Sequence, residues 1–296
     1  MSEPREHRLQ TPDGDICWFE WGERGEGASL LLLHATGFHA RLWDRVVAAL
    51  PAGTHVIAPD HRGHGRSFRP ATLANWAATA DALLPLLDGL GGHPLVGCGH
   101  SMGAYALTRL ASQRPAAFGH LVLIDPVIMD PALYDSENAG PIPDPADHPV
   151  ARRRNRWASP EEMRARFADR PPYARWDPHV LADYCTHGLL SAADGDGLEL
   201  ACPPMIEASV YQNALRTNPH EWLHYLAVPS TLIRAPTGER SSALDFSLSP
   251  TWAGLGAALG AERDELWAEH SHFIPMENPS RVAALLADYL RQAALV

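Results

Sequence analysis

The segment 99–103, with the sequence GHSMG, carries the strongest chemical signal in the chain. It follows a short apolar run at Leu95–Cys98 and precedes apolar residues at helical spacing over Met102–Arg114. A serine held at a sharp strand-to-helix turn has a strained backbone and needs small residues two positions before and after it. The next N–H then lies at a helix N-terminus, which favours an anion. The pattern predicts that Ser101 is a nucleophile for acyl transfer, whereas the alternative is a glycine-rich turn whose serine only caps the helix.

The elements on both sides of this segment alternate between strands and helices. Apolar or alternating segments that predict strands lie at Asp15–Trp21, Leu30–His34, His55–Pro59, Leu95–Cys98 and Leu121–Ile124. Apolar residues at helical spacing lie at Leu42–Leu50, Asn75–Leu90 and Met102–Arg114. Because strands that alternate with helices form parallel sheets covered on both faces, we predict an α/β fold with a mostly parallel sheet flanked by helices.

A long segment without a strand-like run interrupts this alternation from about residue 129 to residue 226. Helix signals within it lie at Ser159–Glu162, Val180–Leu190 and Pro204–Ala214. Strand patterns resume at Thr231–Arg234 and near Glu262–Trp267, and a final helical pattern covers Pro279–Leu295. We therefore predict a core domain of residues 1–128 and 227–296, with residues 129–226 inserted as a helical cap.

Three segments together resemble motifs of the α/β-hydrolase family. Residues 31–38 read LLLHATGF and run from a strand into a loop, residues 60–67 read DHRGHGRS, and residues 99–103 contain the serine. The resemblance implies that the backbone N–H groups of Thr36 and Met102 form an oxyanion hole. Removal of one such donor typically lowers the rate by about 10²–10³.

The segment 60–67 has a structural interpretation. Its glycines allow a tight backbone, and Asp60 and Ser67 can form hydrogen bonds with it. The alternative is a metal site formed by Asp60, His61 and His64. We expect the structural role and no bound metal.

The resemblance also implies a general base near the end of the chain. Residues 271–273, Ser-His-Phe, match the Gly-His-Phe segment of the family with serine in place of glycine, so His272 is the expected base. His270 is the competing candidate, and we interpret it as a loop residue at the surface. Imidazole suits proton transfer at neutral pH because its ordinary pKa is about 6.5.

Two carboxylates compete for the third position of a catalytic triad. The commonest position in the family follows the penultimate strand, where residues 234–239 have Gly238 at the expected place and Glu239 one residue later. The other position follows the preceding strand, at Asp125. Because glycine occupies the usual position, we favour Asp125 and keep Glu239 as the alternative. Either carboxylate would hold His272 in the required tautomer and stabilise the imidazolium.

The residues expected to contact a substrate are mostly aromatic. They are Phe38, His100, Trp157, Trp176 and Tyr211. Aromatic side chains are usually core residues, but the insertion caps the active site in this family, so we expect some of them to line an apolar pocket. The run Arg152–Arg154 is interpreted as a solvated face, with attraction of an acidic substrate as the alternative.

Composition excludes several other classes of protein. The 296 residues carry 35 Asp and Glu against 24 Lys and Arg, and a net charge of -11 opposes binding to nucleic acid or to an anionic membrane. All the basic residues are arginine, which excludes Schiff-base and phosphate-loop lysines. No segment is apolar enough for a signal peptide or a membrane span. Four separated cysteines without a CxxC motif favour free thiols and a cytoplasmic protein.

These observations predict a serine hydrolase that forms an acyl-enzyme and needs no cofactor. Its substrate is expected to be a small molecule, namely a largely apolar carboxylic ester or a related acyl compound. One alternative is a cofactor-free oxygenase or lyase that uses the His272–carboxylate pair as a base, and another is a ligand-binding protein without turnover. An apolar face on the cap or on the final helix could form the interface of a homodimer.

Overall fold

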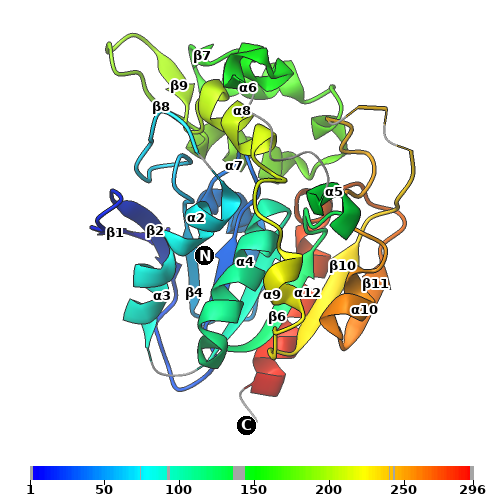
Figure 1. Cartoon of the computed structure of the whole chain (residues 1–296). Coiled ribbons are helices and arrows are strands. Elements are labelled where there is room, and N and C mark those ends of the chain that lie inside the picture. Colours follow the sequence, from blue (N-terminus) through cyan, green and yellow to red (C-terminus); the bar gives the residue numbers. More distant parts are fainter. Residues whose placement is uncertain are drawn as a thin grey trace.

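The structure of the chain is a computed structural model that describes residues 3–73, 75–91, 94–135, 144–239, 241–242 and 244–293. Within these residues, eight strands form one central sheet in the order β1-β2-β4-β3-β5-β6-β10-β11 (Figure 1). The strands are β1 (Arg5–Leu9), β2 (Ile16–Trp21), β3 (Leu30–Leu33), β4 (Val56–Pro59), β5 (Leu95–His100), β6 (Phe118–Ile124), β10 (Ser230–Arg234) and β11 (Arg263–Leu266). Neighbouring strands from β4 to β11 are parallel, whereas β2 is antiparallel to both β1 and β4.

Strand β3 shows why the sheet is buried on both faces. Its four leucines are all buried, and successive side chains point to opposite faces. Leu31 and Leu33 pack into one hydrophobic cluster, and Leu30 and Leu32 pack into another. A continuous apolar run is therefore the pattern of a central parallel strand.

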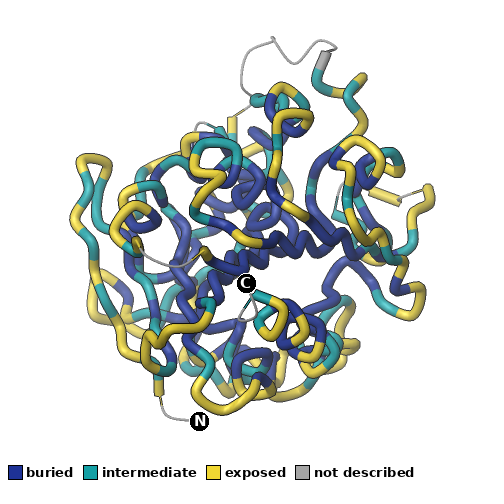
Figure 2. The backbone as a smooth tube through the Cα atoms, turned by 90° about the horizontal axis from the view of Figure 1, so that it is seen from below, coloured by how far each residue is buried: buried dark blue, intermediate teal, exposed yellow. Residues whose placement is uncertain are grey.

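Helices cover both faces of the sheet. One face is covered by α2 (Trp76–Asp81), α3 (Leu84–Leu90) and α4 (Met102–Gln113), and the other by α1 (Asp44–Ala49) and α12 (Pro279–Ala293). The final helix, which the sequence predicted, buries Val282, Leu285, Leu286 and Tyr289 against the sheet. Figure 2 shows the buried residues concentrated in the central layer and the exposed ones around it. The predicted α/β architecture is confirmed.

Strand β1 was not expected from the sequence. It has the sequence REHRL, with only its last residue apolar, and its side chains are exposed or half-buried. It pairs antiparallel with β2 at the edge of the sheet. An edge strand that faces solvent lacks an apolar run, so periodicity could not identify it.

The segment between β6 and β10 contains both helices and strands. Its longer helices are α6 (Pro160–Phe167), α7 (Pro178–His187) and α8 (Pro204–Gln212), and the Ser159 side chain caps α6 by accepting a hydrogen bond from the Glu162 N–H. A second sheet is formed by β7 (Arg156–Trp157), β9 (Leu198–Leu200) and β8 (Leu189–Ser191). The prediction that this segment lacks strands was wrong, because strands of two or three residues are too short to show a period.

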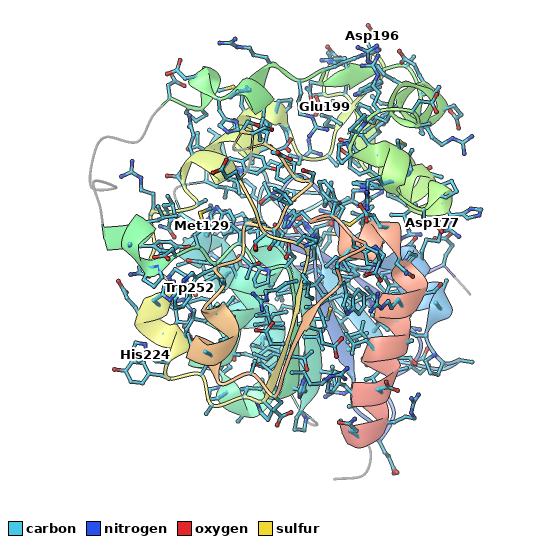
Figure 3. All side chains as sticks on the ribbon, turned by 90° about the vertical axis from the view of Figure 1, so that its right-hand side faces the viewer. Met129, Asp177, Asp196, Glu199, His224 and Trp252 are labelled. Atoms are coloured by element: carbon cyan, nitrogen blue, oxygen red, sulfur yellow. The ribbon has the colours of Figure 1, made fainter. Side chains whose placement is uncertain are left out.

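This segment between β6 and β10, called the insertion below, lies over one end of the central sheet (Figure 1). Asp196 and Glu199 lie at its outer end, and Met129 and Trp252 lie closer to the core (Figure 3). None of the helices in the described part of the chain is both long and apolar enough to cross a membrane.

Candidate active site

Ser101 lies at the sharp turn between β5 and α4. Its backbone has a φ of 58° and a ψ of -118°, which is a strained conformation for a residue with a side chain. A Cβ atom at Gly99 would overlap the backbone of Gly103, and a Cβ atom at Gly103 would overlap the carbonyl group of Leu33 in β3. The glycine spacing of the motif therefore follows from close backbone contacts on both sides of the serine.

This packing predicts that Gly103→Ala destabilises the fold although it removes no side-chain contact. We expect the free energy of unfolding to fall by about 1–3 kcal/mol, as in other overpacked sites. The matched control is Gly89→Ala in α3, where a Cβ atom would meet nothing within 4 Å. Because alanine favours a helix over glycine, this control should be neutral or stabilising by up to about 1 kcal/mol. Urea unfolding of both variants measures the difference, and equal stabilities would contradict the packing argument.

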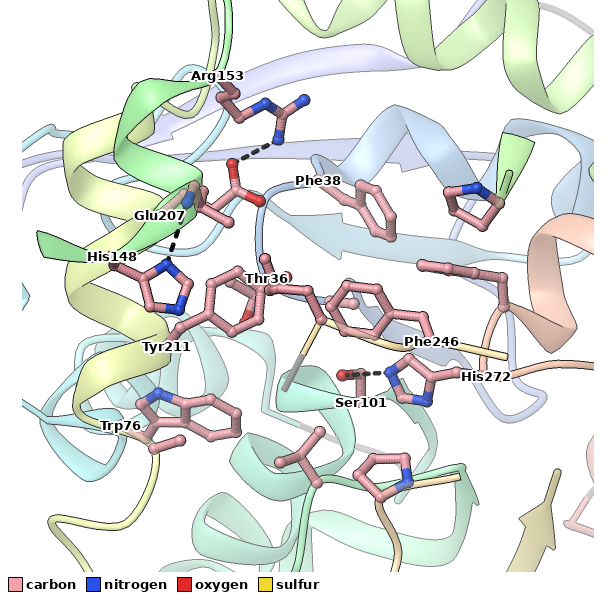
Figure 4. Close-up of a pocket in the computed structure, with 18 of the residues that line it drawn as sticks. Thr36, Phe38, Trp76, Ser101, His148, Arg153, Glu207, Tyr211, Phe246 and His272 are labelled. Carbon is pink, nitrogen blue, oxygen red and sulfur yellow. Dashed lines mark hydrogen bonds and ion pairs between the residues drawn. The ribbon is translucent and has the colours of Figure 1, made fainter. Parts of the chain in front are cut away.

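His272 links Ser101 to a carboxylate. Its Nε2 lies 3.0 Å from Ser101 Oγ and its Nδ1 lies 2.6 Å from Asp125 Oδ2 (Figure 4 shows the first contact). All three side chains are buried, with exposed fractions of 5% or less. The His272 N–H donates to the Phe246 carbonyl at 3.1 Å, and its own carbonyl accepts from His100 Nε2 at 2.8 Å. The loop that carries the imidazole is therefore held at both backbone groups.

Asp125 directly follows β6, which is the neighbour in the sheet of β5, the strand that directly precedes Ser101. Its Oδ1 accepts hydrogen bonds from the Ala235 N–H at 2.9 Å and the Ser249 hydroxyl at 2.6 Å, which leaves Oδ2 for the imidazole. Its φ is 43°, and Ser101 is the other non-glycine residue with positive φ in the described part of the chain. Backbone strain thus coincides with the two strand ends that carry the candidate nucleophile and acid.

Glu239, the alternative acid, does not reach this site. Its side chain is exposed and forms no hydrogen bond or ion pair with any residue that the structure describes. The structure therefore brings together Ser101, His272 and Asp125 and leaves Glu239 apart from them. His270, the competing base, contacts Glu277 through Nδ1 at 3.3 Å and is half-buried, away from the serine.

Thr36 and Met102 meet beside the serine. The Thr36 hydroxyl lies 3.4 Å from Met102 Sδ, which brings the loop after β3 against the start of α4. Neither backbone N–H donates to an acceptor among the described residues. Both N–H groups are therefore free of partners among the described residues, on segments that meet next to the turn at Ser101.

A cavity of about 530 Å³ opens above Ser101 and His272. This volume falls within the range of about 300–1,000 Å³ that small-molecule sites usually have. The aromatic side chains that line it are Phe38, Trp76, Tyr173, Trp176, Tyr211, Phe246 and Phe273. Of the residues expected to contact a substrate, Phe38, Trp176 and Tyr211 line this largely apolar pocket.

Two of the expected substrate contacts are not found at the cavity. His100 is buried beneath it, where Nε2 donates to the His272 carbonyl, and burial holds its pKa well below the usual value. Trp157 packs on Phe167 at 5.4 Å between ring centres, inside the insertion. These two predictions were wrong, because sequence position does not show whether a side chain of the turn or of the segment between β6 and β10 points to the cavity or to the core.

Several lining residues had no recognisable sequence signal. Trp76 begins α2, and Phe246 belongs to the segment after β10 and stacks on the His272 ring. Arg153 and Glu207 form an ion pair at the cavity wall, although the arginine run was interpreted as a solvated face. Their position depends on how the insertion folds over the core, which local patterns do not reveal.

The turn at residues 60–67 has the structural role expected of it. Asp60 is fully buried, and its carboxylate accepts hydrogen bonds from the Ala40 N–H at 2.6 Å and the Arg66 N–H at 2.8 Å. The Ser67 hydroxyl donates to the Asp60 carbonyl at 2.7 Å. Within the described ranges, Asp60, His61 and His64 do not bring ligand atoms close enough together for a metal ion. The turn therefore fixes the loop that follows β4.

Two histidines of this turn make stability depend on pH. Burial lowers the pKa of His61 to about 3 and that of His64 to about 4, so both are neutral in the folded chain and protonate more readily when it unfolds. Stability is therefore fully present above the ordinary histidine pKa of about 6.5 and falls as the pH drops below it. At pH 5.5 each histidine should lower the free energy of unfolding by roughly 1 kcal/mol.

Urea unfolding at pH 7.5 and 5.5 tests this pH dependence. We expect His61→Gln to lose less stability between the two pH values than the unmodified chain, by roughly 1 kcal/mol. The control is His224→Gln, because His224 is exposed. Identical losses for both variants would show that His61 does not contribute.

The comparisons with known proteins agree with this fold and site. A model of the alpha/beta hydrolase family matches residues 30–285. The chain is also similar to lipase LipV of Mycobacterium tuberculosis, with 31% identity over 266 residues that cover 89% of this chain and 93% of that protein. The chain therefore belongs to the alpha/beta hydrolase family, and it is a hydrolase, as the sequence motifs indicated.

Solved structures show the same fold over nearly the whole chain. E-2-(acetamidomethylene)succinate hydrolase superposes with a TM-score of 0.76, at 18% identity over 97% of this chain and 99% of that chain. The esterase Rv0045c of M. tuberculosis superposes with a TM-score of 0.69, at 21% identity over 98% and 93% of the two chains. At these identities the likeness concerns the fold alone.

Proposed function

We propose that the protein is a serine hydrolase that cleaves a small, largely apolar carboxylic ester through a Ser101–His272–Asp125 triad. The observation that carries the proposal is the continuous chain of hydrogen bonds from Ser101 Oγ through both imidazole nitrogens to Asp125, at the floor of a cavity. A nucleophile, a base and a group that orients the base are the parts that acyl transfer requires.

The proposal gives a role to each group of the site. His272 Nε2 takes the hydroxyl proton while Ser101 Oγ attacks the ester carbonyl, and the N–H groups of Thr36 and Met102 stabilise the oxyanion. Asp125 accepts the Nδ1–H bond and stabilises the imidazolium. His272 then donates the proton to the leaving alcohol. Water releases the acid from the acyl-enzyme by the same steps in reverse.

The cavity supports the proposed substrate class. Its volume of about 530 Å³ suits a small molecule, and its aromatic lining favours an apolar acyl or alcohol group. A similar protein with 31% identity over 266 residues is called a lipase, which supports ester hydrolysis in this chain as well.

A fluorophosphonate probe together with p-nitrophenyl acetate tests the proposal. We expect one probe per chain on the peptide that contains Ser101, together with steady release of p-nitrophenol and no oxygen uptake. Labelling without ester turnover would contradict the proposal in favour of a binding protein. Oxygen uptake without labelling would contradict it in favour of a cofactor-free oxygenase.

The wider organisation is part of the same proposal. We propose residues 1–128 and 227–296 as the hydrolase core and residues 129–226 as the cap, since the central sheet and the smaller sheet divide between them in this way. We also propose a cytoplasmic location, which is supported by four cysteines that are all buried free thiols.

A further inference from the structure

The wall of the cavity contains an ion pair among its aromatic side chains. Arg153 follows the short helix η4 (Pro149–Arg152), and Glu207 lies on α8. Arg153 Nη1 lies 2.5 Å from Glu207 Oε2, and Arg153 Nη2 donates to the Tyr184 hydroxyl at 2.9 Å. Figure 4 shows the pair on the side of Ser101 that is away from the His272 ring. Both residues line the same cavity as the serine.

Both members of the pair retain hydrogen-bonding capacity. Toward the described residues, Arg153 uses two of the five N–H donors of its guanidinium, and its side chain remains 22% exposed. Glu207 Oε2 is occupied by Arg153, whereas Oε1 accepts no hydrogen bond from any described residue. A Cβ atom at Gly37 would lie 2.6 Å from Oε1, so this oxygen faces the loop that carries Thr36. The free N–H groups of Arg153 and the Oε1 atom of Glu207 thus offer a ligand a hydrogen-bond donor and an acceptor on neighbouring side chains.

The charge at this wall is balanced. Its titratable neighbours are Tyr173, Tyr184, Tyr211, Cys202 and His148. Burial raises the pKa of each of these tyrosines and of the cysteine and lowers that of the histidine, so all five are neutral near pH 7. The single positive charge of Arg153 is therefore opposed by the single negative charge of Glu207. A ligand carboxylate would bring a second negative charge beside Glu207, and a ligand ammonium would bring a second positive charge beside Arg153, each in a site of low solvent access.

We propose that Arg153 and Glu207 determine specificity by binding a neutral hydrogen-bonding group, such as a primary amide, at the far end of the acyl chain of the substrate. The leaving alcohol must lie near His272 because this residue returns its proton, so the acyl chain extends toward the pair. A primary amide accepts a hydrogen bond from Arg153 and donates one to Glu207 Oε1 without adding charge. This proposal rests on the proposed ester hydrolysis and names its substrate class.

Three series of p-nitrophenyl esters test the proposal, with acyl chains of four to eight carbons. The chains end in a primary amide, in a carboxylate or in an ethyl group of similar size. For at least one chain length, we expect the kcat/KM of the amide ester to exceed that of the ester with the ethyl end by about tenfold or more. The reason is that an apolar end leaves the hydrogen-bonding groups of Arg153 and Glu207 without a partner. A lack of any amide preference, or a preference for the carboxylate, would overturn the proposal.

Two variants assign the preference to the pair. Glu207→Gln leaves Arg153 uncompensated, so we expect the kcat/KM of the carboxylate relative to the amide to rise by about tenfold or more. The double variant Arg153→Met with Glu207→Met should abolish the amide preference, measured as the ratio of the kcat/KM of the amide to that of the apolar ester in that variant. If the double variant does not fold, the Glu207→Gln comparison still decides. An amide preference over the apolar ester that survives the double replacement, or an unchanged carboxylate-to-amide ratio in Glu207→Gln, would overturn the proposal.

The matched control is Arg154→Met. Arg154 is exposed, pairs with Glu162 and does not line the cavity, so its variant should keep the specificity of the unmodified enzyme. p-Nitrophenyl acetate separates the two proposals. If the unmodified enzyme does not hydrolyse this short ester or any longer one, ester hydrolysis itself fails. If it hydrolyses the esters without favouring the amide, only the role of the ion pair fails.

Discussion

Replacement of Ser101 with alanine is expected to lower the kcat for p-nitrophenyl acetate by about 10⁵- to 10⁶-fold. Alanine has no atom that can form the acyl-enzyme, and His272 Nε2, which lies 3.0 Å from the serine oxygen, loses the proton that it would take. The N–H groups of Thr36 and Met102 remain, so a small rate above that of water should persist. The fluorophosphonate label should disappear together with turnover.

The control for this variant is Ser112→Ala. Ser112 lies on the same helix, α4, and its hydroxyl donates to the Arg109 carbonyl at 2.8 Å, outside the cavity. We expect its kcat and its labelling to match those of the unmodified chain. If Ser101→Ala retained more than about a hundredth of the activity, the nucleophile would have to be another group and the proposed mechanism would be wrong.

The sequence predicted those parts of the site that depend on local structure. The turn at Ser101 was recognised because it depends only on local sequence, namely the segment 99–103 with the strand before it and the helix after it. The strands β3 to β6 were recognised because strands buried on both faces must be continuously apolar. In contrast, β1 at the edge of the sheet faces solvent and shows no such run. Local periodicity thus identifies elements that are buried and regular, and it misses edges and very short strands.

The parts that the sequence left open depend on long-range structure. Asp125 and Glu239 follow β6 and β10, which are neighbours in the sheet, so both remained candidates until the loops were known. The Ser249 hydroxyl and the Ala235 N–H hold Asp125, and neither belongs to a motif. Arg153 looked like any exposed arginine of its run, because only the folded insertion places it against the cavity.

The choice between the two carboxylates gives the second large prediction. Asp125→Asn is expected to lower kcat by about 10⁴-fold, while Glu239→Gln should leave it unchanged. Asp125 Oδ2 accepts the Nδ1–H of His272 at 2.6 Å, which fixes the tautomer whose Nε2 can accept the serine proton. An asparagine amide at that position can donate to Nδ1 instead, and this contact favours the tautomer with the proton on Nε2. Glu239 is exposed and contacts no described residue of the site, so its charge has no such effect.

The pH dependence of the residual activity distinguishes a wrong tautomer from a disrupted fold. If the tautomer is the cause, Asp125→Asn should unfold at nearly the same urea concentration as the unmodified chain, because asparagine can still accept hydrogen bonds from Ala235 and Ser249. Its activity should then rise at alkaline pH, where hydroxide takes the serine proton without help from His272. A large loss of kcat in Glu239→Gln together with a small loss in Asp125→Asn would reverse the assignment, since the exposed carboxylate would then have to reach the imidazole through a movement of the loop after β10.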